Sequence, residues 1–579
     1  ALRTTFATVD GRPAQIIAPA DTLPPQTIPV VDLRRLPEDE RQPEAARQAT
    51  AAAAEPFDLA RGPLLRVHLW RLADEDYLAL LNTHHIVSDD WSLGVLMSEL
   101  ASLYATLCKD ERAEVTSPLQ PLPVQYADYA VWQRNWLSGE ILERQMAYWK
   151  EQLAGLPSLL ELPTDRPRPP IQTARGGQHI FALPVELSDA LKALARQEGA
   201  TLFMALLAGY QALLGRYSGQ DDIAVGTPIA NRTRSEIEGL IGFFVNTLVL
   251  RAHLGGAAEP LTFRGLLRQT RETALAAYAH QDVPFEMLVD ALQPARDMSH
   301  SPLFQAMFVL QNAPRQARAL TTGLTLDPVT EGGLPTARFD LTLTMVEDGA
   351  ELGGSLEYNA DLFDPATAER MAQHFAALLA AAVTEPDRPL ADLPLLSEAE
   401  RQQILVAWND TATELPADPR VHLLFEAQVN RTPDATALLF ARAEAGLPDV
   451  SLTYAELNAR ANQLAHHLRS LGVGPESIVA ISVDRSPEMI IGMLGVLKAG
   501  GAYLPIDPTY PADRIAYMLA DSGVQIVLTQ ARVLEAGSWK LETGSWKLEG
   551  GDGSRQGRLV RLDADWPDIA RQPTTNIPN

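Results

Sequence analysis

The sequence contains a single cysteine, Cys108, among 579 residues. One cysteine excludes an intrachain disulfide and any thiol-rich metal site, and it is typical of a reducing compartment such as the cytoplasm. Its surroundings, "MSELASLYATLCKD", follow a helical pattern. We therefore expect a half-buried helical cysteine rather than a nucleophile.

Two further absences narrow the class of protein. No run of about 18 apolar residues occurs, so we expect no membrane-spanning helix and no membrane partner. No basic stripe occurs either, and the formal net charge is −25 at pH 7, which excludes a nucleic-acid partner. With 46% hydrophobic and 21% charged residues, the composition is that of a folded globular protein.

Proline-rich stretches divide the chain, which is too long for one core. "ELPTDRPRPPIQ" predicts a stiff strap, and "EPDRPLADLPLLSEAERQ" begins a linker. We expect a first lobe at 1–160, a strap at 161–172, a second lobe at 173–384, a linker at 385–415 and a third region at 416–579.

Hydrophobic periodicity predicts an α/β (α+β) architecture. Segments 64–70 and 77–83 are typical of an antiparallel hairpin, and Leu93, Leu96, Leu100, Leu103, Tyr104 and Leu107 form one apolar helix face. Strands and helices interleave in the second lobe. In the third region they alternate as in a parallel sheet. "GSWKLE" occurs twice, at 537–542 and 544–549, and we interpret the pair as a duplicated surface loop.

The stretch "NTHHIVSDDWSL" (82–93) holds adjacent histidines, His84 and His85, between the second hairpin strand and the helix. A purely structural interpretation is available, because Ser88 or Asp89 can cap the helix and acidic groups are favoured at a helix start. The histidines would then be ordinary polar residues of a corner.

A catalytic interpretation rests on spacing. An aspartate four residues after a histidine can fix the corner and orient the ring, and an imidazole with a reference pKa of about 6.5 accepts a proton at neutral pH. Another pair, His466 and His467, sits inside a helical pattern without such an aspartate, and we expect it on a helix surface. No metal site is expected, because the other histidines show no ligand spacing.

"HHIVSDDWS" resembles the HHxxxDG motif of condensation domains of nonribosomal peptide synthetases. Other stretches resemble further motifs of that family, in the family's order: "ALRTTF" (1–6), "YADYAVWQ" (126–133), "IGFFVNTLVLR" (241–251), "HQDVPFE" (280–286), "RDMSHSPLFQAMFVLQN" (296–312) and "RFDLTL" (338–343). "LTYAEL" (452–457) and "LKAGGAYLPID" (497–507) resemble the first motifs of an adenylation (AMP-binding) domain. Its glycine-rich Ser/Thr phosphate loop does not appear, so we expect this part to be truncated and inactive.

The resemblance implies two chloramphenicol-acetyltransferase-like lobes in a V, followed by a partial adenylation domain. A tunnel between the lobes would admit two phosphopantetheine arms. His85 would be the catalytic histidine, with His84 supporting it. Asp89 would be mainly structural and paired with an arginine, for which Arg3 is the candidate.

Three more residues take roles from the same resemblance. Asn246 is expected to line the tunnel, and Ser92 to support the motif. Asp90 stands where the family has glycine, which permits positive φ and close backbone approach; we expect its carboxylate to alter turnover. The chain also starts at "ALRTTF", so we expect an incomplete first lobe.

The implied reaction is amide bond formation between a carrier-bound acyl or peptidyl thioester and a carrier-bound aminoacyl group. Its partners would be upstream and downstream peptidyl carrier domains and the remainder of the synthetase. No cofactor is expected on this chain: 4'-phosphopantetheine belongs to the carriers, and ATP and Mg to a complete adenylation domain. Epimerization of a carrier-bound residue, a degenerate carrier-docking module and a freestanding acyltransferase are the alternatives.

Overall fold

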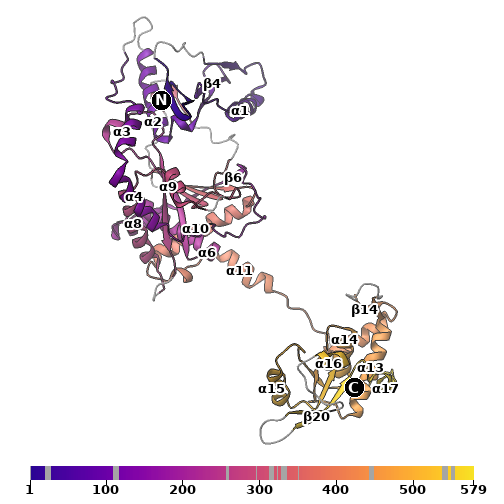
Figure 1. Ribbon diagram of the computed structural model, residues 1–579. Coiled ribbons are helices and arrows are strands. Elements are labelled where there is room, and N and C mark those ends of the chain that lie inside the picture. Colours follow the sequence, from indigo (N-terminus) through magenta and orange to yellow (C-terminus); the bar gives the residue numbers. More distant parts are fainter. Residues whose placement is uncertain are drawn as a thin grey trace. The chain divides into compact units, whose positions relative to one another are not determined.

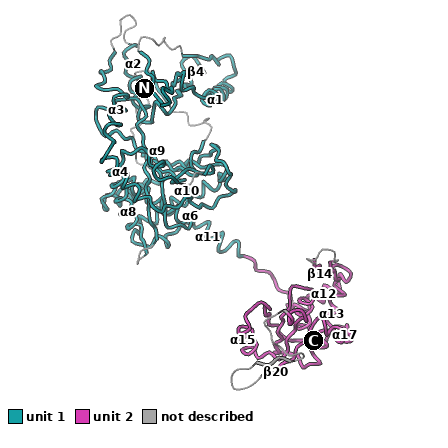
Figure 2. Tube along the Cα trace, in the orientation of Figure 1, with its two compact units in different colours: residues 1–409 teal, residues 410–579 magenta. Residues whose placement is uncertain are grey.

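The computed structural model divides into two compact units, Ala1–Asn409 and Asp410–Asn579, shown in Figure 2. The division falls inside the segment 385–415, which the sequence indicates as a linker. The structure describes residues 2–19, 28–108, 117–255, 260–294, 297–311, 319–321, 324–327, 336–349, 351–416, 418–441, 449–536, 545–548 and 555–578.

The first lobe of unit 1 contains a three-stranded sheet in the order β3-β4-β5. Its strands are β3 (Val30–Asp32), β4 (Leu65–Arg71) and β5 (Tyr77–Thr83), and β4 pairs antiparallel with β5, which confirms the predicted hairpin. Helix α1 (Glu38–Ala54) covers the sheet, and Gln48 accepts a 2.8 Å hydrogen bond from the buried Trp70 indole. A separate hairpin pairs β1 (Thr4–Val9) with β2 (Arg12–Ile17).

Helix α2 (Asp90–Leu107) follows the histidine pair, and α3 (Tyr126–Trp136) and α4 (Gly139–Gln152) come after it. The expected apolar face of α2 is present in the sequence, but Leu93, Leu100 and Leu107 are exposed and Ser92 is the one fully buried residue of the helix. Cys108, at the C-cap of α2, is exposed rather than half-buried. The helical periodicity predicts which residues share one face of α2, but it does not predict whether another element packs against that face.

The second lobe is built on a mixed six-stranded sheet in the order β6-β13-β12-β9-β7-β8. Parallel pairs join β12 to β9 and β9 to β7, and the other pairs are antiparallel. The strands are β6 (Gly176–Leu183), β7 (Asp222–Ile229), β8 (Asn246–His253), β9 (Ala306–Gln311), β12 (Leu341–Asp348) and β13 (Glu351–Asn359).

Helices cover this sheet and form the main core (Figure 1). They include α5 (Val185–Gln197), α6 (Leu202–Ser218), α8 (Phe263–Ala279), α9 (Phe285–Leu292) and α10 (Pro365–Thr384). Helix α6 is mainly apolar and is buried on every side from Met204 to Gly215. Thr201 caps its start and Gly219 ends it at φ 68°, a conformation that glycine adopts at little cost.

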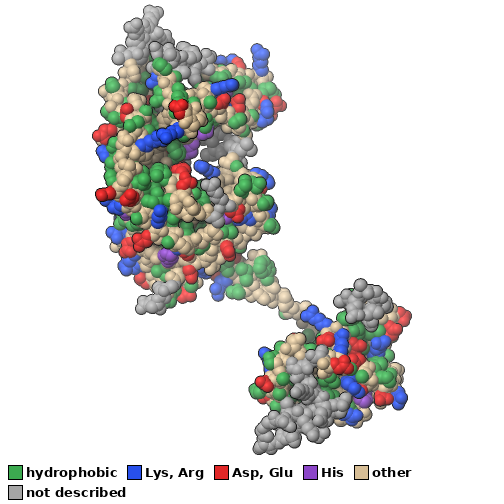
Figure 3. Space-filling view, viewed as in Figure 1, with side chains coloured by type: hydrophobic (Ala, Val, Ile, Leu, Met, Phe, Trp, Pro, Cys, Tyr) green, Lys and Arg blue, Asp and Glu red, His purple; other side chains and the backbone are tan. Residues whose placement is uncertain are grey.

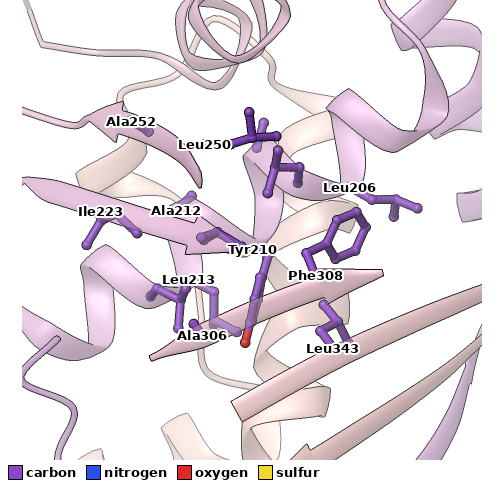
Figure 4. Close-up of a cluster of buried hydrophobic side chains, with 14 of the residues drawn as sticks. Leu206, Tyr210, Ala212, Leu213, Ile223, Leu250, Ala252, Ala306, Phe308 and Leu343 are labelled. Carbon is purple, nitrogen blue, oxygen red and sulfur yellow. The ribbon is translucent and has the colours of Figure 1, made fainter. Parts of the chain in front are cut away.

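Figure 4 shows the centre of this core, where Tyr210 of α6 lies beside Phe308 of β9. Burying one such large side chain contributes roughly 1.5–3 kcal/mol, so the second lobe is a firm support for any site at its edge. The strap at 161–172 runs along this lobe, where Arg168 forms an ion pair with the buried Asp340.

Short elements complete unit 1. They are α7 (Ser235–Glu238), β10 (Ala319–Thr321), β11 (Leu324–Thr325), η3 (Leu390–Asp392), α11 (Glu398–Leu405) and η4 (Ala407–Asn409). Strand β10 lies beside α2, so a segment of the second lobe reaches the first.

Unit 2 contains a five-stranded sheet in the order β17-β16-β18-β20-β19. Four neighbouring strands are parallel, as the sequence predicts: β16 (Ile478–Ile481), β17 (Ala502–Pro505), β18 (Ile526–Thr529) and β20 (Arg555–Arg561). The edge strand β19 (Ser545–Leu548) is antiparallel and comes from the second "GSWKLE" copy. The surface-loop prediction is wrong for that copy; the first copy lies outside the described residues.

The helices of unit 2 are α12 (Val421–Arg431), α13 (Tyr454–Ser470), α14 (Pro487–Ala499), α15 (Ala512–Ser522), α16 (Ala531–Ala536) and α17 (Trp566–Ile569), and β14 (Thr436–Phe440) pairs with β15 (Val450–Thr453). Helix α13 carries the second histidine pair, half-buried on the helix. His466 Nε2 lies 3.0 Å from the carbonyl oxygen of Thr575, a structural contact.

Candidate active site

The first histidine pair lies where strand β5 ends. The short helix η2 (His85–Val87) follows, and α2 begins at Asp90. The backbone N–H of His84 donates to the carbonyl of Leu64 at 3.0 Å, which extends the β4–β5 pairing up to the motif. The predicted corner between strand and helix is confirmed.

His85 is exposed, and its Nδ1 lies 2.6 Å from the carbonyl oxygen of Ser88. Because a carbonyl oxygen can only accept a hydrogen bond, Nδ1 must carry the proton, and the neutral ring then keeps its lone pair on Nε2. Within the described part of the chain, no hydrogen bond engages Nε2. The ring is therefore held in the tautomer that a general base requires, with its accepting nitrogen available.

His84 has a different environment. Its Nδ1 accepts a 3.1 Å hydrogen bond from the backbone N–H of Ile86, and its ring meets Phe57 edge-on at 5.9 Å. These contacts fix the turn at the start of η2. His84 supports the corner that presents His85.

Asp89 is buried and caps helix α2. Its Oδ1 accepts from the backbone N–H of Ser92 at 2.8 Å, and its Oδ2 accepts from those of Phe244 and Val245 at 2.9 and 3.3 Å. The carboxylate also forms an ion pair with Arg232 at 3.1 Å, and the two side chains are 4% and 2% exposed.

The pairing of Asp89 with Arg3 is therefore wrong. Arg3 is exposed and donates to the carbonyl of Ala18 in the first hairpin. Arg232 takes the expected place because the chain after β7 passes the start of α2, a tertiary contact that no local pattern reveals. Its guanidinium also donates to the carbonyls of Ile237 and Leu240 and lies 4.0 Å from the ring centroid of Phe244. Burial lowers the pKa of Arg232, and the nearby Asp89 opposes that change.

Ser92 is fully buried and joins α2 to the segment before β8. Its Oγ donates to the carbonyl of Gly242 at 2.8 Å and accepts from the backbone N–H of the same residue and from Arg232, at 3.0 and 2.7 Å. Tyr126 of α3 adds a 2.8 Å hydrogen bond from its hydroxyl to the carbonyl of Phe243. A Cβ at Gly242 would lie 2.2 Å from the Tyr126 ring, so this close approach requires glycine.

The segment 242–244, which these hydrogen bonds hold and which is called the clamped segment below, places Phe243 against the catalytic candidate His85. The rings of His85 and Phe243 meet edge to face, with centroids 5.0 Å apart and planes at 89°. The sequence singled out neither Phe243 nor Arg232. The stretch "IGFFVNTLVLR" was the available signal for Phe243, but which of its aromatic residues faces outward depends on the fold.

Asn246, expected to line a tunnel, is buried and held by backbone groups. Its Nδ2 donates to the carbonyls of Gln281 and Val283 at 2.8 Å each, and its Oδ1 accepts from the N–H of Phe285 at 3.1 Å. It thereby ties the start of β8 to the stretch "HQDVPFE".

Asp90 is the first residue of α2 and is exposed. The position is helical and needs no positive φ, so an aspartate fits where the resembled motif has glycine. A carboxylate in the first helical turn is also favoured by the helix dipole.

A cavity of about 380 Å³ opens at the carboxyl ends of β7, β9 and β12, a size typical of small-molecule sites. Ile229, in its wall, stands opposite Asn246 in the β7–β8 register. The lining is mainly apolar: Thr201, Leu202, Phe203, Thr227, Pro228, Ile229, Tyr278, Val309, Leu310 and Glu347. The cavity thus adjoins the strand that continues from the clamped segment.

Other kinds of site find little support in the described part of the chain. It contains no group of three or more His, Cys, Asp and Glu side chains placed to hold a metal ion. None of its helices combines the length and apolar character needed to cross a bilayer. Acidic and basic side chains are interspersed on the visible face, as Figure 3 shows.

Comparison with known proteins assigns both units. Residues 1–405 match the condensation domain family, and residues 425–569 match the AMP-binding enzyme family. The chain is 49% identical over 571 residues to one of the linear gramicidin synthase proteins of Brevibacillus parabrevis, a match that covers 99% of this chain and 10% of that protein. The chain thus spans about a tenth of the length of this relative.

Solved structures agree with the observed α/β architecture. The crystal structure of holo-AB3403, a four-domain nonribosomal peptide synthetase bound to AMP and glycine, matches with a TM-score of 0.73 at 24% identity, covering 97% of this chain and 40% of that one. The X-domain from teicoplanin biosynthesis, solved in complex with OxyB, matches with a TM-score of 0.58 at 27% identity, covering 69% and 85%. The chain belongs to the condensation-domain family of nonribosomal peptide synthetases, and its second unit is an AMP-binding segment.

Proposed function

We propose that unit 1 forms amide bonds between a carrier-bound acyl or peptidyl thioester, the donor, and a carrier-bound aminoacyl group, the acceptor. The observation that carries this proposal is the exposed His85 ring, whose Nδ1–H is held by the Ser88 carbonyl and whose Nε2 is available. A base of this kind suits a reaction in which an amine loses a proton.

In the proposed step the acceptor's amine nitrogen attacks the donor's thioester carbonyl. A C–N bond forms and the C–S bond breaks. Nε2 of His85 takes the proton that the nitrogen loses and passes it to the departing sulfur, which leaves as the free thiol of the donor's phosphopantetheine arm. The growing chain then rests on the acceptor carrier.

The demand on the base is moderate. An α-amino group has a reference pKa of about 7.7–8.0, so a useful neutral fraction is present at physiological pH. Holding both thioesters together can supply effective molarities of about 10⁵ M or more. Asp89 acts through position: it joins the start of α2 to Arg232 and to the backbone before β8.

The proposed partners are the peptidyl carrier domains on either side and the rest of the synthetase, in the cytoplasm. Their phosphopantetheine arms are substrates rather than cofactors of unit 1. ATP and Mg would belong to a complete adenylation domain. The proposed step in unit 1 uses neither ATP nor Mg.

The test uses the full synthetase that carries this chain, with donor and acceptor carriers loaded in advance. His85→Ala is expected to lower the rate of peptide transfer by about 10²- to 10⁴-fold, the usual contribution of a general base. His466→Ala, which removes a histidine from unit 2, is the matched control and is expected to keep the wild-type rate. Equal rates for His85→Ala and wild type would refute the proposal.

Two other functions give different outcomes in the same system. An epimerizing site would exchange the Cα proton of the acceptor residue for deuterium without any donor. A docking module would tolerate His85→Ala and still bind carriers or other enzymes, an alternative favoured by the likeness to the X-domain solved with OxyB. Carrier binding measured beside transfer separates docking from catalysis.

A further inference from the structure

Phe243 is a large apolar side chain that remains 36% exposed beside the catalytic candidate. Its ring stands perpendicular to that of His85, with centroids 5.0 Å apart. The adjacent Phe244 behaves as a core residue: it is 2% exposed and packs among Tyr126, Tyr129 and Arg232. Phe243 belongs to none of the described hydrophobic clusters, so core packing does not explain its position.

The backbone around Phe243 is fixed on both sides. Gly242 exchanges two hydrogen bonds with Ser92, the carbonyl of Phe243 accepts from Tyr126, and the N–H of Phe244 donates to Asp89. All of these partner side chains come from α2, its cap or α3. Four hydrogen bonds therefore fix the backbone that presents this apolar ring to the imidazole.

We propose that Phe243 is a specificity-determining residue, an apolar wall that sets the size of the side chain accepted on the aminoacyl or acyl group reacting at His85. This inference rests on the proposed amide-forming function. A proton taken by Nε2 comes from a nitrogen within about 2.6–3.2 Å. The Phe243 ring centroid lies 5.0 Å from that of the imidazole, which is close enough for the ring to face the substituents of a nitrogen bound at Nε2.

The ligand chemistry is an apolar aliphatic or aromatic side chain, which either the donor or the acceptor can present. In a hydrophobic site, one methylene group changes discrimination by about 10- to 200-fold. Phe243→Ala removes the whole ring. It is expected to shift relative kcat/KM toward bulky substrates by at least about 10-fold, and Phe243→Leu by less.

The experiment measures peptide transfer by the full synthetase with alanyl and leucyl groups on the carriers. In one arm the donor varies and the acceptor stays fixed; in the other arm the acceptor varies. If the leucyl-to-alanyl kcat/KM ratio shifts in one arm only, the substrate varied in that arm is the one that contacts Phe243. If the ratio shifts in both arms, the ring contacts both substrates.

Two controls separate the possible failures. Phe181→Ala truncates a half-buried phenylalanine of β6 packed against Phe375, and is expected to lower stability without changing the kcat/KM ratio. His85→Ala tests the underlying reaction. If His85→Ala abolishes transfer while Phe243→Ala leaves both ratios unchanged, the inference about Phe243 is wrong and the proposed function stands. If His85→Ala transfers normally, the proposed function itself fails.

Discussion

Replacing Arg232 by alanine is the sharpest test of how the site is held together. The guanidinium and the Asp89 carboxylate lie 3.1 Å apart and are almost completely buried. Arg232→Ala leaves that carboxylate buried without its counter-charge and removes the donor that serves the carbonyls of Ile237 and Leu240. Removing one partner of a buried ion pair typically lowers the free energy of unfolding by about 3–5 kcal/mol, and we expect Arg232→Ala to lower it by an amount in this range.

The assay is urea-induced unfolding of the chain, followed through the transition of unit 1. Arg3→Ala is the matched control, because Arg3 is exposed and, among the described residues, its guanidinium donates only to the nearby Ala18 carbonyl. We expect Arg3→Ala to stay within about 0.5 kcal/mol of wild type. A double-mutant cycle with Asp89→Ala then isolates the coupling between Asp89 and Arg232. A loss for Arg3→Ala as large as that for Arg232→Ala, or no coupling in the cycle, would refute this account of the site.

Three further outcomes are expected. Gly242→Ala places a Cβ 2.2 Å from the Tyr126 ring, so it should destabilise the folded protein by about 1–3 kcal/mol and slow peptide transfer. Gly94→Ala is the control, because there is open space around Gly94, and it should have neither effect. Thermal unfolding and a transfer assay measure both variants. Asp90→Gly should change the kcat of peptide transfer, and a kcat equal to that of wild type would show that the Asp90 carboxylate has no effect on the reaction. Burial raises the pKa of Glu357 above its reference value of 4.5, so ionisation of this group destabilises the folded state. Glu357→Gln should therefore unfold at a higher temperature than wild type at pH 8. This difference in unfolding temperature should shrink as the pH falls toward 4.5.

The corner that carries the histidines could be predicted from the sequence because its signals are local. Alternating apolar residues specify the β4–β5 hairpin, and Asp89 is a strong capping residue for the helix that follows. The parallel sheet of unit 2 could be predicted in the same way, from alternating strand and helix patterns. In each case the deciding interactions lie within a few residues.

The rest of the site depends on contacts between distant segments. Arg232 is 143 residues from Asp89, and no local pattern distinguishes it from the other arginines of the chain. Arg3 was therefore a plausible but wrong partner. The same limit applies to Phe243 and Phe244, which are identical in type yet differ in exposure because Tyr126 and Arg232 enclose only the second.

The burial of individual residues of α2 could not be predicted from the sequence either. The apolar residues of α2 have regular helical spacing, but whether a neighbour covers them is a tertiary matter, and Leu100 and Cys108 are exposed. The second "GSWKLE" copy pairs with β20 as an edge strand because that strand offers a free antiparallel partner.

The most direct test of the central claim is the single-turnover rate of peptide transfer by His85→Ala in the full synthetase, measured with and without added imidazole. Because the His85 ring is exposed, free imidazole can reach the space it leaves. The account predicts a fall of about 10²- to 10⁴-fold with partial recovery in imidazole. A variant that transfers the donor at the wild-type rate would contradict it.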